Sequence, residues 1–185
     1  MHLVQSESIL ETSRLLFEPI HPSHALALFE PLQSSAIYNF IPESPPTSAE
    51  ALAARYQKLA VRTSPDGQEL WLNWGMRLRN NDEYVGVLQA TVYPDATAYL
   101  AYILFPPFWK QGYASEGCRR ILELLFTDYQ VRIVIAEIDT RNTASMKLVE
   151  HLGFQRVGTK LDADFFKGST SHEYHYEILS PDQAG

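Results

Sequence analysis

The apolar and polar positions of the chain alternate in blocks that predict a sheet in its middle third. Three strand-like runs follow one another there: ELWLNWGMRLR, EYVGVLQATVY and TAYLAYILF. The turns between them contain Asn80, Asn81 and Asp82 in one case and Pro94 and Asp95 in the other. Strands joined by such short turns pair with their neighbours, so this region is predicted to be an antiparallel meander.

Two helices are predicted before the meander. A strand over Arg14–Ile20 comes first, and Ser23 then caps a short helix that Pro31 ends. After the proline-rich stretch IPESPP, Thr47 and Glu50 have the spacing of a capping box for a second helix. The buried positions of that helix recur at i, i+4 and i+7, at Leu52, Tyr56 and Leu59.

A helix, a strand, a further helix and a hairpin are predicted after the meander. The first helix spans about Ala114–Asp128 and presents Cys118 on its apolar face. The segment Val131–Ile138 is almost entirely apolar, which indicates a strand buried on both faces and parallel to TAYLAYILF across the intervening helix. A last helix covers Asn142–Leu152, and FQRVGTKL and HEYHYEIL form the closing hairpin.

Length and charge narrow the class of protein. A chain of 185 residues that is 45% hydrophobic can bury one core, which predicts a single domain over residues 1–185, with its core at about 10–180 and short flexible termini. The net charge of −7 without a basic stripe argues against a nucleic-acid partner. No apolar run has the length of a signal peptide or a membrane span, and the lone Cys118 fits a reducing compartment. We therefore expect a cytoplasmic protein with no membrane partner.

The stretch FPPFWKQGYASEG has the features of a phosphate-binding turn. Pro106 and Pro107 lack amide hydrogens, so the strand before them is expected to part from its neighbour and to present main-chain donors to a ligand. After them, a run of amides around Gly112 meets the positive end of the next helix, which suits a pyrophosphate. The residues predicted to bind such a ligand here are Ile103, Leu104, Phe105, Lys110, Gln111, Gly112, Tyr113, Ala114 and Ser115.

The segment Trp109–Ala114 resembles the pyrophosphate loop R/Q-x-x-G-x-G/A of the GNAT superfamily, although Trp109 replaces the first residue. This replacement is typical of the branch that contains the ribosomal-protein alanine and serine acetyltransferases, whose loop looks like WGKGYATEA. ETSRLLFEPI, Gly86 and RNTASMKLVEHLGF match the same family in the same order. The resemblance implies a mixed α+β fold of three layers, in which helices flank a mostly antiparallel sheet of about seven strands with a splayed parallel pair. It also implies acetyl-CoA as cosubstrate.

Asn142 and Ser145 begin the last predicted helix. The resemblance implies that Asn142 contacts the pantetheine arm and that Ser145 lies near the thioester sulfur, where its hydroxyl can protonate the departing thiolate. Many relatives use a tyrosine for this step, but the matching position here holds Val149. The alternative is that Ser145 only satisfies the first amides of the helix that Asn142 caps.

Glu137 ends the apolar face of the strand over residues 131–138. A desolvated carboxylate has a raised pKa and is a better base near neutral pH. The resemblance also places the catalytic glutamate of related amino-terminal acetyltransferases at this position. The alternative is a structural ion pair with a neighbouring Arg or Lys. Tyr99 stands where this branch often has another glutamate.

These features predict an enzyme that transfers an acetyl group from acetyl-CoA to a primary amine, either a protein N-terminus or a small molecule, by direct attack in a ternary complex. A non-catalytic acyl-CoA-sensing module is the alternative, and a nucleotide-binding domain with the same helix start is a third hypothesis. We expect a monomer or homodimer. We also expect no metal site, because His172 and His175, the one candidate pair, point to opposite faces of a strand. Four aromatic residues are candidates for the acceptor site: Phe40, Trp71, Trp74 and Tyr99.

Overall fold

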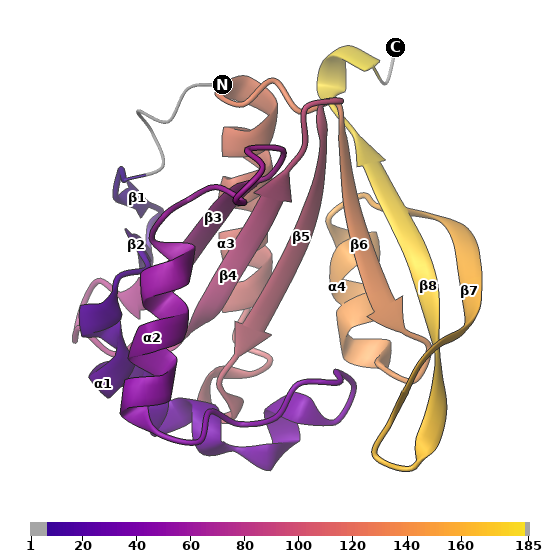
Figure 1. Ribbon diagram of the computed structural model, residues 1–185. Helices are drawn as coiled ribbons and strands as arrows, with labels where there is room; N and C mark the ends of the chain where they lie inside the picture. Colours follow the sequence, from indigo (N-terminus) through magenta and orange to yellow (C-terminus); the bar gives the residue numbers. More distant parts are fainter. Residues whose placement is uncertain (1–6, 184–185) are drawn as a thin grey trace.

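The sheet is mixed and mostly antiparallel, as predicted, with one short strand added at its edge. The computed structural model describes residues 7–183, and within this range eight strands form one sheet in the order β1-β2-β3-β4-β5-β6-β8-β7. Neighbouring strands are antiparallel except β5 and β6, which run parallel (Figure 1). The strands are β1 (Leu10–Glu11), β2 (Leu15–Pro19), β3 (Leu70–Leu78), β4 (Tyr84–Val92), β5 (Thr97–Leu104), β6 (Ile133–Asp139), β7 (Gln155–Phe166) and β8 (Ser169–Leu179).

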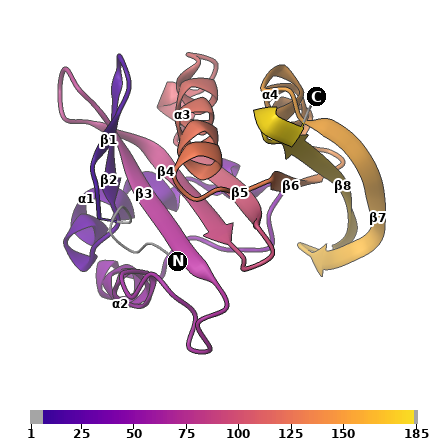
Figure 2. The same ribbon diagram turned by 90° about the horizontal axis from the view of Figure 1, so that it is seen from above.

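Helices cover both faces of the sheet, which confirms the expected three layers. Figure 2 shows α1 and α2 on one face, here called the α2 face, and α3 on the other, here called the α3 face. The larger apolar core lies on the α3 face and includes Cys118, while a smaller one lies beneath α1 and α2. The helices are α1 (Ala25–Phe29), α2 (Ala49–Leu59), α3 (Tyr113–Thr127) and α4 (Thr143–His151).

The predicted caps of the first two helices are wrong. Ser48 and not Thr47 is the N-cap of α2, because the Ser48 hydroxyl accepts a hydrogen bond from the Ala51 amide at 3.1 Å. Ser23 caps no helix, because it lies inside a 3₁₀ turn, Pro22–His24, that precedes α1. Both errors displace a boundary by one or two residues and leave the elements themselves unchanged.

The closing hairpin is longer than predicted and reaches a distant segment. Lys167, in the turn between β7 and β8, donates hydrogen bonds to the carbonyl oxygens of Tyr38 and Ile41. The segment 31–47 passes below the end of β5 towards this hairpin (Figure 1). At the C-terminus, Pro181–Gln183 forms a 3₁₀ turn where no structure was expected. The rest of the expected flexible termini, residues 1–6 and 184–185, lies outside the described residues.

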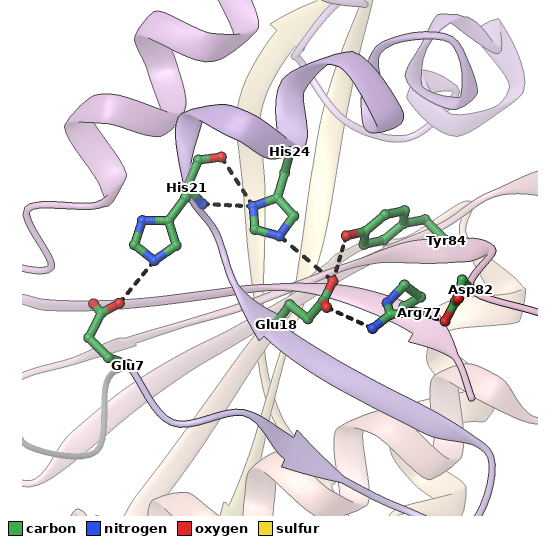
Figure 3. Close-up of polar contacts among 7 residues, drawn as sticks. All are labelled: Glu7, Glu18, His21, His24, Arg77, Asp82 and Tyr84. Atoms are coloured by element: carbon green, nitrogen blue, oxygen red, sulfur yellow. Dashed lines mark hydrogen bonds and ion pairs between the residues drawn. The ribbon is translucent and has the colours of Figure 1, made fainter.

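A polar cluster holds β2, β3 and β4 together at the edge of the sheet farthest from β7 (Figure 3). The Glu18 carboxylate accepts hydrogen bonds from the Tyr84 hydroxyl at 2.5 Å and the Arg77 guanidinium at 2.9 Å, and it lies 3.7 Å from Nε2 of His24. Burial acts to raise the pKa of Glu18, but the Tyr84 and Arg77 hydrogen bonds outweigh it and lower the pKa. This network links side chains of three neighbouring strands, β2, β3 and β4.

Candidate active site

Strands β5 and β6 pair only over their first residues. The last paired residues are Tyr99 and Ile135, although β5 continues to Leu104 and β6 to Asp139. Beyond this pair the two strands diverge, as Figure 1 shows. Strands that separate leave the inner main-chain donors and acceptors of each strand without a ladder partner. The predicted splayed parallel pair is confirmed.

The main-chain amides of β5 divide between β4 and this opening. The Phe105 amide donates to the Val85 carbonyl oxygen at 2.9 Å, so the expectation that it faces a ligand is wrong. Alternate residues of an antiparallel strand face opposite edges, which directs the Ile103 amide to β4 as well. The amides of Tyr102 and Leu104 therefore face the opening.

The turn after β5 presents a row of main-chain donors. Gly112 has φ 82°, a left-handed conformation that glycine adopts without strain, and α3 begins directly after it at Tyr113. Within residues 7–183, the amides from Lys110 to Ser115 have no hydrogen-bond acceptor. Because the N-terminus of a helix also carries a partial positive charge, this turn can bind an anion such as a pyrophosphate.

Two cations flank this turn, and the sequence predicted one of them. Lys110 is exposed beside the row of amides. Arg14, which sequence reasoning missed, donates to the Gln111 carbonyl oxygen at 3.0 Å and forms an ion pair with Glu116 at 2.6 Å. Its guanidinium also lies 4.4 Å from the centre of the Tyr113 ring. No local pattern could have linked Arg14 to a turn that lies about 100 positions further along the chain.

The start of α4 lies beside β5 on the α3 face. The Asn142 side-chain oxygen accepts the Ser145 amide at 3.1 Å, so Asn142 caps α4 and the Ser145 hydroxyl is not needed for capping. The Tyr102 hydroxyl lies 3.5 Å from the Ser145 carbonyl oxygen. Burial raises the pKa of Tyr102, so this hydroxyl stays protonated at all ordinary pH values. Val149, at the position matched to a tyrosine, is fully buried in the core and adds no hydroxyl.

On the α2 face, five residues form a row across the sheet at the level of the opening. Asn73 is in register with Gln89, and Gln89 with Ala101; beyond the opening, Glu137 is in register with His175. Ala101 and Glu137 occupy equivalent positions, two residues past the last pair of β5 and β6. Because residues in register share a face, all five lie on one side of the sheet, and we call them the polar row. Ala101 has no side chain beyond Cβ and leaves room beside the opening.

Glu137 is not the desolvated carboxylate that the sequence predicts. Its side chain is 36% exposed and lies 3.6 Å from Nδ1 of His175. Nε2 of His175 lies in turn 3.1 Å from the Glu177 carboxylate. Burial, and then the charges of Glu137 and Glu177, raise the pKa of the neighbouring Tyr99. The polar row thus ends in a carboxylate–imidazole–carboxylate chain.

A pocket of about 370 Å³ lies over the first part of the polar row. Helix α2 and the segment 41–47 form its wall, and β3, β4 and β5 form its floor. Asn73, Gln89 and Ala101 belong to this floor, so the pocket ends at the strand that borders the opening. The polar side chains of the wall include Tyr38, Glu43, Arg55 and Tyr56.

The predicted acceptor aromatics lie mostly outside this pocket. Trp74 borders it, although the strand alternation directs the indole into the α3-face core, where Trp74 is 1% exposed, so its contact with a substrate stays a prediction. Trp71 and Tyr99 lie on the α2 face beyond the pocket lining, and the Trp71 indole donates to Glu69 at 2.7 Å. Phe40 is half-buried in the loop before the pocket wall and does not line the pocket.

Of the pocket residues that sequence reasoning missed, only Asn73 could have been recognised from the sequence. Asn73 interrupts the apolar strand LWLNWGM, and an amide in the middle of such a strand must find a partner or face a ligand. The periodicity predicts Tyr56 in the buried stripe of α2, and Arg55 resembles any exposed cation of a helix. Their convergence depends on how α2 crosses the sheet, which the local sequence does not specify.

The two histidines considered as a metal pair contact different partners. His172 accepts the Asp162 amide at 2.9 Å, while His175 lies between Glu137 and Glu177. In the described part of the chain, no group of three or more His, Cys, Asp or Glu side chains is arranged to hold a metal ion.

Among the helices of residues 7–183, none has the length and apolarity to cross a membrane.

A sheet that opens between two parallel strands, next to a helix start that can bind an anion and a pocket on the opposite face, is consistent with an acyltransferase. The family model described as Acetyltransferase (GNAT) domain matches residues 14–155, and the chain belongs to this family. The resemblance noted in the sequence is confirmed. GNAT proteins use acetyl-CoA.

The relatives agree with this assignment over nearly the whole chain. The N-acetyltransferase YoaA of Bacillus subtilis, itself uncharacterised, is 25% identical over 175 residues, which cover 94% of this chain and 97% of YoaA. A Salmonella typhimurium acetyltransferase that modifies the N-terminal serine of ribosomal protein L7/L12 superposes with a TM-score of 0.81 at 20% identity, covering 93% and 99% of the two chains. The ribosomal L7/L12 acetyltransferase RimL, solved in complex with coenzyme A, superposes with a TM-score of 0.82 at 20% identity, covering 93% and 98%.

Proposed function

We propose that this chain is an acetyl-CoA-dependent N-acetyltransferase in which a primary amine attacks the thioester directly in a ternary complex. The observation that supports this is the polar row, which runs along the pocket floor to the opening between β5 and β6. Pocket and opening meet at Ala101, so acceptor and cosubstrate can be bound together. Because β8, beyond the matched range, pairs with β6, we assign the whole chain, residues 1–185, to one catalytic domain.

The main-chain donors around the opening suit the cosubstrate. The amides of residues 110–115 bind the pyrophosphate, and Lys110 adds a positive charge. Asn142 uses its side-chain oxygen for the cap and keeps its NH₂ group for a carbonyl of the pantetheine arm. Acetyl-CoA supplies the activated acetyl thioester when it is bound. The Leu104 amide stabilises the negative charge that develops on the acyl oxygen, and loss of one such donor costs about 3 kcal/mol.

Residues on the two sides of the opening transfer the protons of the reaction. An N-terminal amine has a pKa of about 8 and a lysine amine one of about 10.4, so the acceptor must lose a proton before it attacks. Glu137, directly or through a water, accepts this proton, and His175 beside it shares the charge. The Ser145 hydroxyl, which the cap leaves free, protonates the departing thiolate.

Two observations favour the alternative of a non-catalytic acyl-CoA sensor. The position of the tyrosine acid holds the fully buried Val149, and Glu137 lacks the desolvated environment expected of a strong base. Binding of the cosubstrate requires neither of these groups. The two functions therefore differ in thiol release and not in affinity for CoA.

Thiol release from acetyl-CoA with a broad panel of amines and peptides tests the proposal. We expect turnover in the unchanged protein and in the control Glu123→Gln, an exposed carboxylate of α3. Glu137→Gln should lower kcat at pH 7 by about 100-fold or more and leave the thermal stabilisation by CoA intact. An unaltered pH–rate profile in Glu137→Gln removes Glu137 from the role of base. Stabilisation by CoA without thiol release from any amine supports the sensor, and stabilisation by ATP but not by CoA supports a nucleotide-binding domain.

A further inference from the structure

The pocket on the α2 face contains two buried polar side chains without a partner. Asn73 is 8% exposed and Tyr56 is 5% exposed, and both line the pocket. Among the described residues, neither the Asn73 amide nor the Tyr56 hydroxyl has a hydrogen-bond partner. Burial raises the pKa of Tyr56 to about 12, so its hydroxyl remains a donor. Both residues line the pocket, so their polar groups are placed to hydrogen-bond with a polar ligand there.

The same pocket contains a cation that no carboxylate of the described residues neutralises. Arg55 lines the wall opposite the floor, and no Asp or Glu lies within ion-pair distance of it, whereas Arg14, Arg77 and Arg141 each have such a partner. Burial raises the pKa of the Tyr38 hydroxyl, and the nearby charge of Arg55 opposes that rise. Arg55 is exposed, lines the pocket and is near enough to Tyr38, another lining residue, for its charge to act there. A planar guanidinium in this position matches a carboxylate, which it can bind through two hydrogen bonds.

Glu43 adds the opposite charge at the wall. It also lines the pocket, and within residues 7–183 no cation lies within ion-pair distance of it. A pocket that holds one unpaired cation and one unpaired anion above a neutral polar floor complements a ligand that bears both an ammonium and a carboxylate group. An uncharged amine or a diamine would leave Arg55 without a partner.

We infer that the acceptor is an amine that also carries a carboxylate, and that Arg55 binds this carboxylate while the amine lies over Ala101 at the opening. The inference rests on the proposed function and names the class of its acceptor. Two sources have this chemistry: a free amino acid, and a peptide N-terminus followed by an acidic side chain. The pocket volume of about 370 Å³ lies at the small end of ligand sites and accommodates a single amino acid.

The test combines two enzyme variants with matched pairs of acceptors. Arg55→Gln removes the charge from the pocket wall, and Lys58→Gln makes the same change on the same helix at an exposed position outside the pocket. Each protein is assayed for thiol release with free amino acids and with their carboxamides, over a range of pH because the two amines differ in pKa. Since every variant meets the same acceptors, the ratio between variants cancels that difference.

We expect the unchanged protein and Lys58→Gln to prefer the carboxylate acceptors by about 10- to 100-fold in kcat/KM, the range for a hydrogen-bonded charge pair. Arg55→Gln should lose this preference and keep its thermal stabilisation by CoA. Arg55→Lys, which keeps the charge and loses the planar fork, should retain part of it.

C-terminally amidated peptides that differ only in Glu or Gln at the second position distinguish the source of the carboxylate. Peptides preferred over free amino acids identify an acidic N-terminus, and the reverse identifies an amino acid; both agree with a carboxylate on Arg55. Equal rates with carboxylates and carboxamides, or an unchanged preference in Arg55→Gln, overturn the inference alone. Absence of thiol release with every acceptor, while CoA still binds, contradicts the proposed function itself.

Discussion

The Asp139 side chain holds the turn that leads from β6 into α4, and its replacement by asparagine is expected to destabilise the protein. The carboxylate is 2% exposed and accepts hydrogen bonds from the Arg141 guanidinium at 2.6 Å, the Arg141 amide at 2.8 Å and the Ser171 hydroxyl at 2.8 Å. The Arg141 hydrogen bonds contribute most to a pKa of about 2, well below the usual 3.8. Asn142, the cap of α4, follows directly on this turn.

The lowered pKa of Asp139 sets both the size of this loss of stability and its dependence on pH. A lowering of almost two pKa units corresponds to about 2 kcal/mol of stability. Because the folded-state pKa lies below the unfolded value, the unfolded chain binds the proton more tightly. The contribution is therefore complete above about pH 4, roughly halved at pH 3 and lost as the pH falls through about 2.

Urea unfolding of the unchanged protein and Asp139→Asn, followed by tryptophan fluorescence, measures this difference at pH 7, 5 and 3. We expect about 2 kcal/mol at the two higher pH values and about half of it at pH 3. Asp162→Asn is the control, because the Asp162 carboxylate is 79% exposed and its pair with His172 spans 3.7 Å; its effect should stay below about 1 kcal/mol. An Asp139→Asn cost below about 0.5 kcal/mol, or one that is equal at pH 7 and pH 3, would refute the electrostatic argument.

Two further predictions concern packing. Gly86→Ala should lower the stability by about 1 to 3 kcal/mol in thermal unfolding, because a Cβ at Gly86 would overlap the Ile103 carbonyl oxygen of β5. The control Gly158→Ala should be nearly neutral, since a Cβ at Gly158 would lie 3.8 Å from its nearest neighbour. Cys118 is fully buried, and burial raises its pKa, so a disulfide reagent should label it only as the protein unfolds. Rapid labelling of the native protein would show that α3 does not cover this thiol.

The fold could be predicted because most of its strands are specified locally. The turns at Asn80–Asp82 and Pro94–Asp95 enforce the meander, and the apolar run of β6 correctly indicated a buried strand parallel to β5. One error lies where two neighbouring residues offer the same chemistry. Thr47 and Ser48 both have a capping hydroxyl, and only the direction in which the chain enters α2 decides between them.

The candidate site has one part that the local sequence specifies and one part that depends on strand pairing. The turn before α3 is local, since Pro106, Gly112 and the start of α3 lie within a few residues of one another, and its geometry was predictable. The floor of the pocket, by contrast, depends on the register in which neighbouring strands pair. Asn73 and Gln89 become neighbours only because β3 and β4 pair as they do, and no spacing in the sequence encodes that pairing.

The polar row also explains why the divergence of β5 and β6 matters for chemistry. If the two strands stayed paired, Ala101 and Glu137 would be adjacent positions of a closed ladder, and the main-chain donors of β5 would be occupied by β6. Their separation at this level frees the Leu104 amide on one strand and leaves Glu137 with His175 on the other. A single break in the ladder thus places a main-chain donor and a carboxylate on opposite sides of the opening in which, as we propose, an amine and a thioester meet.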